Sequence, residues 1–336
     1  MHGKGINYDT GTFPGGRSSR ETFDPAVVRR ELRIIADDLH CNAVRVTGGD
    51  PARLSVAGEA AAEAGLRVWF SPFPAELNPE ELLELFDDCA GRAESLRRDG
   101  ADVVLIAGCE LSMFASGFIP GEDAYARMAT MSSGDPGLWA SLAEVPAKMS
   151  AFFADVAATV RKRFGGPVTY AAGPWETLDW SPFDFVSVDA YRAAYNKANY
   201  REELRRHFEH GKPVVATEFG CCTYRGAADA GATGWMIIDR SAEPPAINGD
   251  YQRDEGEQVR YLRELLEIFE QEELHSAFWF NFAGYHVPHR ADPHYDLDLA
   301  SYGVVKVLEN GTGREYPDMA WEPKEVFHAL AAAYAD

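Results

Sequence analysis

Two glutamates, Glu110 and Glu218, stand at the ends of short apolar segments, VVLIA (103–107) and VVAT (214–217). A pair of facing carboxyl groups is what cleavage of a glycosidic bond requires. One protonates the leaving oxygen, and the other attacks the anomeric carbon or activates a water molecule. The alternative is that each glutamate is a solvated loop residue. The pair supports a catalytic role only if the fold brings the two carboxyl groups together.

The elements that would position this pair alternate along the chain. We predict strands at Gly5–Tyr8, Ala43–Val46, Arg67–Ser71, Val103–Ala107, Val168–Ala172, Phe185–Asp189, Val214–Thr217 and Ser276–Asn281. Amphipathic helices follow most of them; two of these helices open at Asp24-Pro25 and Asn78-Pro79, which are N-cap and first-turn signals. Gly65 is a helix C-cap signal. A closing helix is predicted at about Lys324–Tyr334.

Eight apolar strands that alternate with helices predict a parallel sheet closed into one (β/α)₈ TIM barrel over residues 1–336. We expect long loops after strands four, seven and eight. A doubly wound open sheet is the structural rival. It requires a phosphate-binding turn after the first strand, but the glycines at 11–16 lack the GxGxxG spacing.

In such a barrel, the residues just past each strand meet at one mouth. Glu110 follows strand four and Glu218 follows strand seven, on opposite sides, so that their long side chains can converge. Carboxylates, an arginine and aromatic residues at the other strand ends suit a carbohydrate site. The predicted substrate-binding residues are Asp9, Arg45, Trp175, Glu176, Asp189, Tyr191, Trp279 and Asn281.

Several of these residues have a second interpretation. Asp9 either accepts hydrogen bonds from sugar hydroxyls or caps a turn, and the roles of Glu176 and Asp189 are equally open. Trp175 is expected to stack on the apolar face of a sugar. Trp69, in the third strand, is expected to pack inside the barrel.

These residues resemble the motifs of glycoside hydrolase clan A, a group of retaining enzymes on (β/α)₈ barrels. The resemblance rests on AGCEL (107–111), VATEFG (215–220) and NAVR (42–45). It implies that Glu110 is the acid/base and Glu218 the nucleophile. It also implies that Arg45 pairs with the nucleophile and that Tyr191 hydrogen-bonds it. Trp279 would be the sugar platform.

The chain departs from the clan at Cys109, because the clan usually places an asparagine there to bind the sugar 2-hydroxyl. A thiol is a poor hydrogen-bond partner. The segments GINYDT (5–10) and RVTGGD (45–50) also resemble actinobacterial proteins labelled "abortive infection". One alternative is therefore a barrel that binds sugar without cleaving it, with a role in phage defence.

A second alternative is a metal-dependent hydrolase or isomerase. The loop after strand eight contains residues of the types that bind metals, but in no known ligand spacing. They are His286, His289, Asp292, His294 and Asp296. The interpretation favoured by the sequence has no metal and no cofactor: a retaining hydrolase of a small β-linked glycoside.

Charge and composition narrow the class of protein further. The net charge is −21, from 32 Lys and Arg against 53 Asp and Glu, which argues against binding to nucleic acid or to an anionic membrane surface. The sequence shows no export signal and no apolar run of the roughly 20 residues that a membrane span needs. Five cysteines, an odd and sparse number, suit free thiols. We therefore expect a cytoplasmic protein, and the sequence leaves its oligomeric state open.

Overall fold

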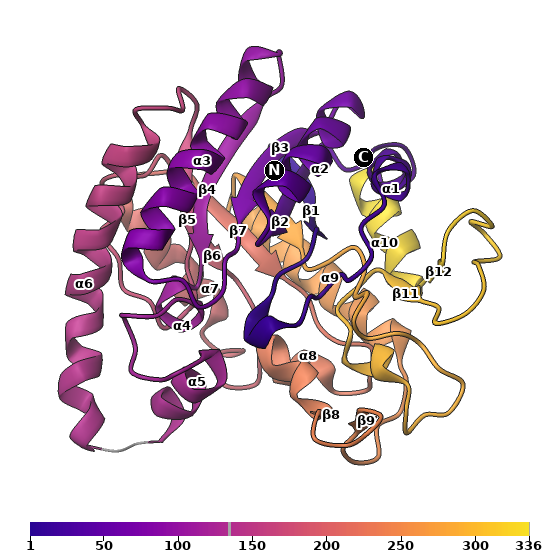
Figure 1. Cartoon of the computed structure of the whole chain (residues 1–336). Helices are drawn as coiled ribbons and strands as arrows, with labels where there is room; N and C mark the ends of the chain where they lie inside the picture. The colour runs from indigo at the N-terminus through magenta and orange to yellow at the C-terminus, as the bar shows by residue number, and fades with distance from the viewer. Residues whose placement is uncertain (134–135, 336) are drawn as a thin grey trace.

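A computed structural model describes residues 1–133 and 136–335, and it confirms the predicted barrel. Eight parallel strands form its wall (Figure 1). They are β1 (Gly3–Asp9), β2 (Ala43–Gly48), β3 (Arg67–Pro72), β4 (Val103–Cys109), β5 (Val168–Ala171), β6 (Val186–Asp189), β7 (Val214–Phe219) and β10 (Ser276–Trp279).

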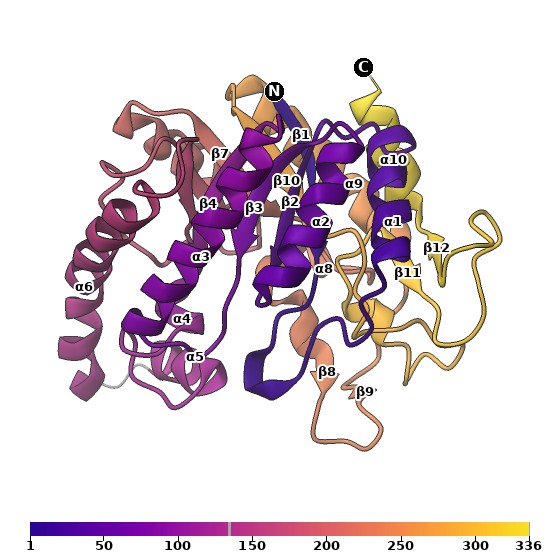
Figure 2. The ribbon, with the colours of Figure 1, turned by 45° about the horizontal axis from the view of Figure 1, so that its top comes forward.

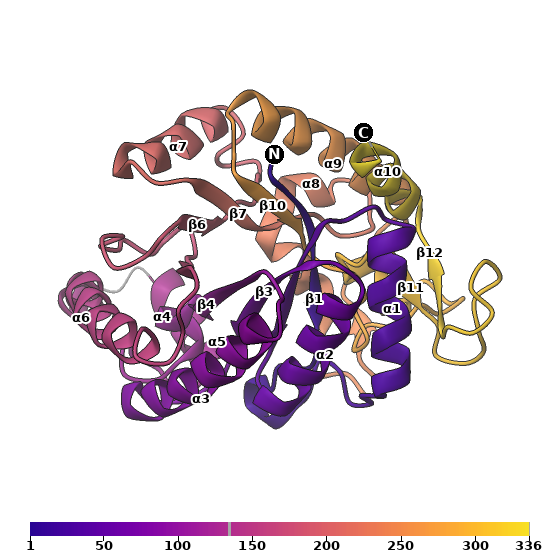
Figure 3. The ribbon, with the colours of Figure 1, turned by 90° about the horizontal axis from the view of Figure 1, so that it is seen from above.

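The strands run side by side in the order β5-β4-β3-β2-β1-β10-β7-β6, which is the order of a rolled sheet. A parallel bridge between Ala172 and Val188 joins the two edge strands. The backbone N–H of Asp189 donates to the carbonyl of Ala172 at 2.9 Å across the same seam. The sheet therefore closes on itself, and the helices surround it when the molecule is seen from above (Figure 3).

Helices cover the outside of the wall between successive strands (Figure 2). The main ones are α1 (Pro25–Asp37), α2 (Pro51–Glu63), α3 (Pro79–Arg98), α6 (Pro136–Val160), α7 (Tyr200–Arg206), α9 (Glu255–Gln271) and α10 (Glu325–Tyr334). Short 3₁₀ turns occur at Pro14–Gly16, His207–His210, Gly231–Ile237 and Leu297–Ala300.

The helix signals read from the sequence act as predicted. The Asp24 carboxylate accepts the Ala26 N–H at 2.8 Å, and Pro25 is the first residue of α1. Asn78 and Glu81 form a reciprocal capping box at the start of α3. Such caps satisfy amide groups that have no partner within the helix, and so they fix where the helices begin.

The apolar core has two layers on either side of the barrel wall. Alternate strand residues point inward and form a small cluster within the barrel: Ala43, Trp69, Val104, Ile106, Cys109, Ala171, Phe185, Val215 and Phe278. The larger cluster packs between the strands and the helices. Trp69 belongs to the inner cluster and is fully buried, as predicted.

Long insertions follow β4, β7 and β10, and they lie at the C-terminal side of the barrel (Figure 1). The first contains α4 (Leu111–Phe114) and α5 (Ala124–Ser132). The second contains α8 (Ala227–Ala230) and the hairpin β8 (Ile238–Asp239) and β9 (Ala246–Ile247). The third contains β11 (Val305–Val307) and β12 (Trp321–Pro323).

Helix α6 runs from Pro136 to Val160 and contains Pro146, which lacks the N–H that would bond the preceding turn. Among the described residues, none of the helices is long and apolar enough to pass through a membrane.

Candidate active site

Glu218, at the end of β7, is held by a cation on one side and a hydroxyl on the other. Nη1 of Arg45 donates to its Oε1 at 2.7 Å, and the hydroxyl of Tyr191 donates to its Oε2 at 2.9 Å. All three side chains are buried. A neighbouring guanidinium and two hydrogen bonds favour the charged form of a carboxyl group and fix its orientation. The structure thus brings together the three residues that the clan resemblance relates.

Arg45 is itself fixed by the barrel interior. It is fully buried on β2, where its Nε donates to the Ser71 hydroxyl on β3 at 3.1 Å. Its Nη1 also lies 3.3 Å from the Thr217 carbonyl on β7. The Asn7 amide, on β1, donates to that same carbonyl at 3.0 Å. Groups on β3 and β7 therefore hold the guanidinium next to Glu218, and Asn7 joins β1 to the same carbonyl.

Glu110 leaves β4 in a strained backbone conformation. Its φ is +46° and its ψ is 39°, which is left-handed and uncommon for a residue with a side chain. The Ala171 carbonyl on β5 accepts its N–H at 3.0 Å and anchors it there. Outliers of this kind concentrate at functional sites, where the surrounding structure enforces them.

The surroundings of Glu110 favour its protonated form. Burial raises the pKa of Glu110 well above its ordinary value, and the negative charges of Asp189, Glu218 and Glu176 raise it further. These charges act on Glu110 because the four carboxyl groups share the mouth of the barrel. A carboxylic acid that keeps its proton near neutral pH can protonate a leaving group.

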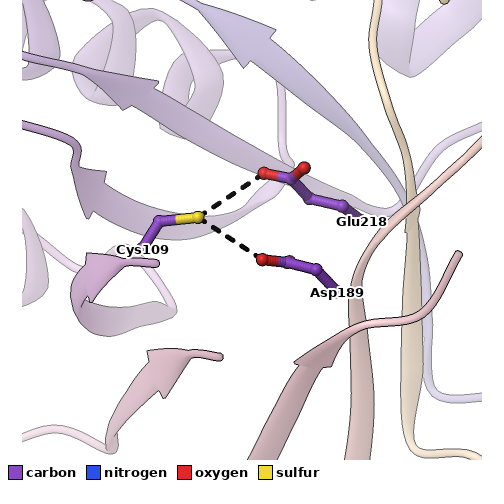
Figure 4. Close-up of side chains that lie close together, drawn as sticks. All are labelled: Cys109, Asp189 and Glu218. Atoms are coloured by element: carbon purple, nitrogen blue, oxygen red, sulfur yellow. Dashed lines mark hydrogen bonds between the residues drawn. The ribbon is translucent and has the colours of Figure 1, made fainter. Parts of the chain in front are cut away.

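Cys109, Asp189 and Glu218, the nucleophile candidate, form a buried cluster (Figure 4). The Cys109 sulfur lies 3.5 Å from Oδ2 of Asp189 and 3.7 Å from Oε1 of Glu218. Burial, followed by the charge of Asp189, raises the pKa of the Cys109 thiol well above its usual range. The thiol is therefore protonated, with two carboxyl groups as acceptors.

Asp189 is the least solvated acid of this cluster. The Thr217 hydroxyl donates to its Oδ1 at 2.9 Å. Burial and the charge of Glu218 raise the pKa of Asp189 well above its ordinary value. The cluster is also the one group within residues 1–133 and 136–335 whose ligand atoms are close enough to hold a metal ion. The Arg45 guanidinium on Glu218 supplies a positive charge there, so the cluster does not fit a cation.

Two other predicted residues, Glu176 and Trp175, have mainly local contacts in the structure. The Glu176 carboxylate accepts from the Tyr170 hydroxyl at 2.9 Å, and from the N–H groups of Ser112 and Gly173 at 3.0 Å each. The Trp175 indole N–H donates to the Ser112 hydroxyl at 3.1 Å, while 36% of the residue's surface stays exposed.

Asp9 lies at the end of β1 and is half-buried. Its Oδ1 accepts the Gly11 N–H at 2.8 Å. Of its two interpretations, the turn cap is the one that the contact supports.

Trp279 does not reach the barrel mouth, which corrects the prediction that it is a sugar platform. It is fully buried in the outer core layer, where its ring packs against Phe219 with centroids 5.4 Å apart. Side chains alternate along a strand, so Phe278 points into the barrel and Trp279 points away from it. The next residue, Phe280, is half-buried, and its ring lies 5.7 Å from that of Tyr302.

The sequence did not predict Phe280 as a site residue, because the clan resemblance pointed to Trp279. The signal that could have found it was the alternation within Phe278-Trp279-Phe280. Tyr302 connects Phe280 to the site, because its ring also lies 6.0 Å from that of Tyr191.

Three buried side chains at the strand ends have a polar atom without a partner among the described residues: Oδ1 of Asn7, Oγ1 of Thr47 and Oδ1 of Asn281. They come from β1, from β2 and from the segment directly after β10. Buried polar atoms almost always have a hydrogen-bond partner. These three atoms therefore lack the hydrogen-bond partner that such groups normally have.

The histidine-rich loop does not assemble a metal site among residues 1–133 and 136–335. His289 pairs instead with Asp296, with Nδ1 and Oδ1 3.0 Å apart, and Asp292 accepts the His294 N–H at 3.0 Å. Arg253 also contacts Asp296, at 3.2 Å. The contact between Arg253 and Asp296 joins the loop to the neighbouring insertion after β7.

No protein-family model matches the chain, and no curated protein sequence matches it. Solved structures of similar fold include a GH113 β-1,4-mannanase (14% identity, 99% of each chain, TM-score 0.62). They also include the β-glucuronidase of Parabacteroides merdae (13% identity, TM-score 0.58). The match covers 99% of this chain but only 36% of that longer protein.

A hyperthermophilic β-glucosidase is similar as well, with 9% identity, 97% and 98% of the two chains covered, and a TM-score of 0.54. Identities this low establish a shared fold and nothing finer. The chain thus has the barrel fold found in several glycoside hydrolases.

Proposed function

We propose that this chain is a retaining glycoside hydrolase in which residues 1–336 form one catalytic unit. The observation that carries the proposal is the contrast between two carboxyl groups at one mouth. Arg45 and Tyr191 hold the carboxyl group of Glu218 by hydrogen bonds, whereas burial and neighbouring charges raise the pKa of Glu110. Divergent surroundings of this kind assign the acid and the nucleophile.

The proposed reaction has two steps. The Glu218 carboxylate attacks the anomeric carbon, and the bond to the leaving group breaks as Glu110 transfers its proton to the departing oxygen. An ester between the sugar and Glu218 results. Glu110, now a base, takes a proton from water, which attacks the same carbon and frees Glu218.

The other side chains at the mouth would bind the sugar. Phe280 replaces Trp279 as the proposed apolar platform, and Asn281 offers a free acceptor. Trp175 and Asp189 stay proposed substrate contacts, while Asp9 and Glu176 would position the loops that carry them. The insertions after β4, β7 and β10 lie around the mouth, which favours a short β-linked glycoside over a polymer.

The proposal is tested with 4-nitrophenyl β-glycosides of mannose, glucose and glucuronic acid. Glu218→Gln is expected to lower kcat at least about 1,000-fold, because the amide is no nucleophile. Glu59→Gln, an exposed change on α2, is the matched control and should leave kcat unchanged. Circular dichroism confirms that both variants fold. Equal turnover by Glu218→Gln and wild type would refute the assignment.

The stereochemistry of the first-formed sugar tests the retaining step. Proton NMR during turnover should show the β-anomer before mutarotation, because two inversions at one carbon restore the configuration. An α-anomer as the first product would mean that Glu218 activates water instead.

A non-catalytic sugar-binding barrel, with a role in phage defence, is the second candidate. Cys109 favours it, because its thiol is directed to Asp189 and Glu218 and is a weak hydrogen-bond partner for a sugar hydroxyl. Calorimetric binding of a free monosaccharide, with no turnover of any aryl glycoside, would favour this candidate over the hydrolase.

A further inference from the structure

An apolar pocket of about 170 Å³ opens beside the acid/base candidate, between α6 and the loop after β5. Four of its lining residues follow one another on α6 at helical spacing and present one face: Leu142, Val145, Pro146 and Met149. Ile119 and Met131, from the insertion after β4, and Trp175, after β5, complete the apolar lining.

Two residues that line the pocket relate it to Glu110. Ser112 stands two residues after Glu110, and the charge of Glu176 acts on Glu110. The Ser112 N–H donates to the Glu176 carboxylate at 3.0 Å, which links the two loops. β4 and β5 are adjacent in the barrel, whereas Glu218 follows β7 on the other side. The pocket is therefore on the acid side of the mouth.

Two of the three polar side chains that line the pocket, Ser112 and Glu176, are already hydrogen-bonded within the protein, whereas Thr177 is exposed to solvent. The Ser112 hydroxyl accepts from Trp175, and the Glu176 carboxylate accepts from Tyr170 and from two backbone N–H groups. A second sugar would need free partners for its hydroxyls, because unmade hydrogen bonds cost affinity. An apolar occupant needs none.

We propose that this pocket binds the leaving group of the substrate, and that this group is hydrophobic and about the size of one aromatic ring. The inference rests on the proposed function, because a general acid touches the leaving oxygen and so defines the leaving-group side. A cavity of about 150 Å³ with an apolar lining holds one benzene molecule, which sets the size. Stacking on the exposed face of Trp175 supplies the orientation.

Direct binding tests the pocket without any turnover. Calorimetry measures the Kd of 4-nitrophenol for wild type, Leu142→Gln, Val145→Gln and Ala147→Gln. Leu142 and Val145 are half-buried and line the pocket, whereas Ala147 is exposed on the same helix and does not line it. We expect Kd to rise about tenfold in the first two variants and to stay constant in the third. An equal Kd in all four proteins, or no binding to wild type, overturns the proposal.

Kinetics provide the second arm. Methyl, butyl and hexyl β-glycosides of the sugar that is turned over have leaving groups of similar acidity, so differences in kcat/KM report contacts of the chain. Each added methylene is expected to raise kcat/KM about three- to fourfold in wild type. Leu142→Gln should flatten this trend, whereas Ala147→Gln should not. A flat series in wild type overturns the proposal.

The binding experiment and the kinetic experiment together distinguish the pocket proposal from the proposal that the chain is a hydrolase. Binding of 4-nitrophenol that weakens in Leu142→Gln, without turnover of any glycoside, supports the apolar pocket while the hydrolase assignment fails. Turnover with a flat alkyl series and no binding of 4-nitrophenol supports the hydrolase while the pocket proposal fails.

Discussion

At the scale of single residues, the proposed acid and the proposed nucleophile differ in what surrounds them. Glu218 has a guanidinium and a phenol within 2.9 Å. Glu110 has no cation of this kind at hydrogen-bond distance in the described part of the chain, and three carboxyl groups act on it. Asp189 contributes to this contrast, because its negative charge is the largest influence on Glu110 after burial.

The effect of Asp189 on Glu110 predicts a change in the pH profile. A general acid must be protonated, so kcat/KM should fall as pH rises through the raised pKa of Glu110. Asp189→Asn removes one negative charge, which lowers the pKa of Glu110 and moves this alkaline limb to lower pH. The profile is measured with an alkyl β-glycoside, whose departure needs the proton.

Asp9→Asn is the control for this prediction, because Asp9 is a rim carboxylate that is absent from the charges acting on Glu110. Its alkaline limb should coincide with that of wild type. A limb that stays in place in Asp189→Asn would contradict the assignment of Glu110 as the acid.

At the scale of elements, irregular strands direct both glutamates. Relative to β5, strand β4 carries an extra residue between Ile106 and Cys109. Relative to β6 and β10, strand β7 carries an extra residue just before or at Glu218. A bulge of this kind reverses the alternation of side chains and re-aims the residues that follow. Gly108, with φ of +94°, makes the bulge in β4 possible.

This role of Gly108 predicts separate effects on stability and activity. In Gly108→Ala the left-handed backbone costs about 1–2 kcal/mol. The new Cβ would also lie 2.7 Å from Leu111 Cδ1 and displace the turn that carries Glu110. We expect kcat to fall about 100-fold, because misplacement of a catalytic group by about 1 Å costs that much.

Gly100→Ala is the matched control, since Gly100 has φ of +101° and open space at its Cβ position. Urea unfolding should show a loss of stability in both variants, larger in Gly108→Ala because of the contact with Leu111, with kcat reduced only in Gly108→Ala. Unchanged kcat in Gly108→Ala would mean that the bulge does not position Glu110.

At the scale of the whole molecule, buried ion pairs connect the insertions to the chain's last helix. Lys324, directly before α10, is fully buried, with its Nζ 3.0 Å from Asp298 and 2.8 Å from the Thr223 hydroxyl. Arg253 contacts the other oxygen of Asp298 at 2.8 Å. Segments after β7 and after β10 thus meet at one network, which holds the walls of the mouth together.

Removal of one charged partner from this network should lower the free energy of unfolding. Lys324→Met leaves Asp298 with less compensation for its buried charge, and we expect the free energy of unfolding to fall by about 3–5 kcal/mol. Lys306→Met breaks a more exposed pair with Glu255 and should cost less than about 1 kcal/mol. Urea unfolding at neutral pH compares the two. Equal losses would show that the buried network does not hold the insertions.

Much of the barrel could be predicted from the sequence because its signals are local. Strand runs, helix caps at Asp24 and Asn78, and helix-stopping glycines each depend on a few neighbouring residues. Glu110 and Glu218 were found the same way, since a strand end in a parallel barrel defines a position at the mouth.

Tertiary structure decided where each side chain points. The burial of Trp279, the partial exposure of Phe280 and the bulges before both glutamates depend on how strands pair, and one residue of register reverses a side chain. The satisfied carboxylate of Glu176 and the α6 face of the pocket depend on contacts between distant segments. The sequence by itself therefore determined where the strands end at the mouth, and packing determined which side chains reach it and which of them are free to meet a substrate.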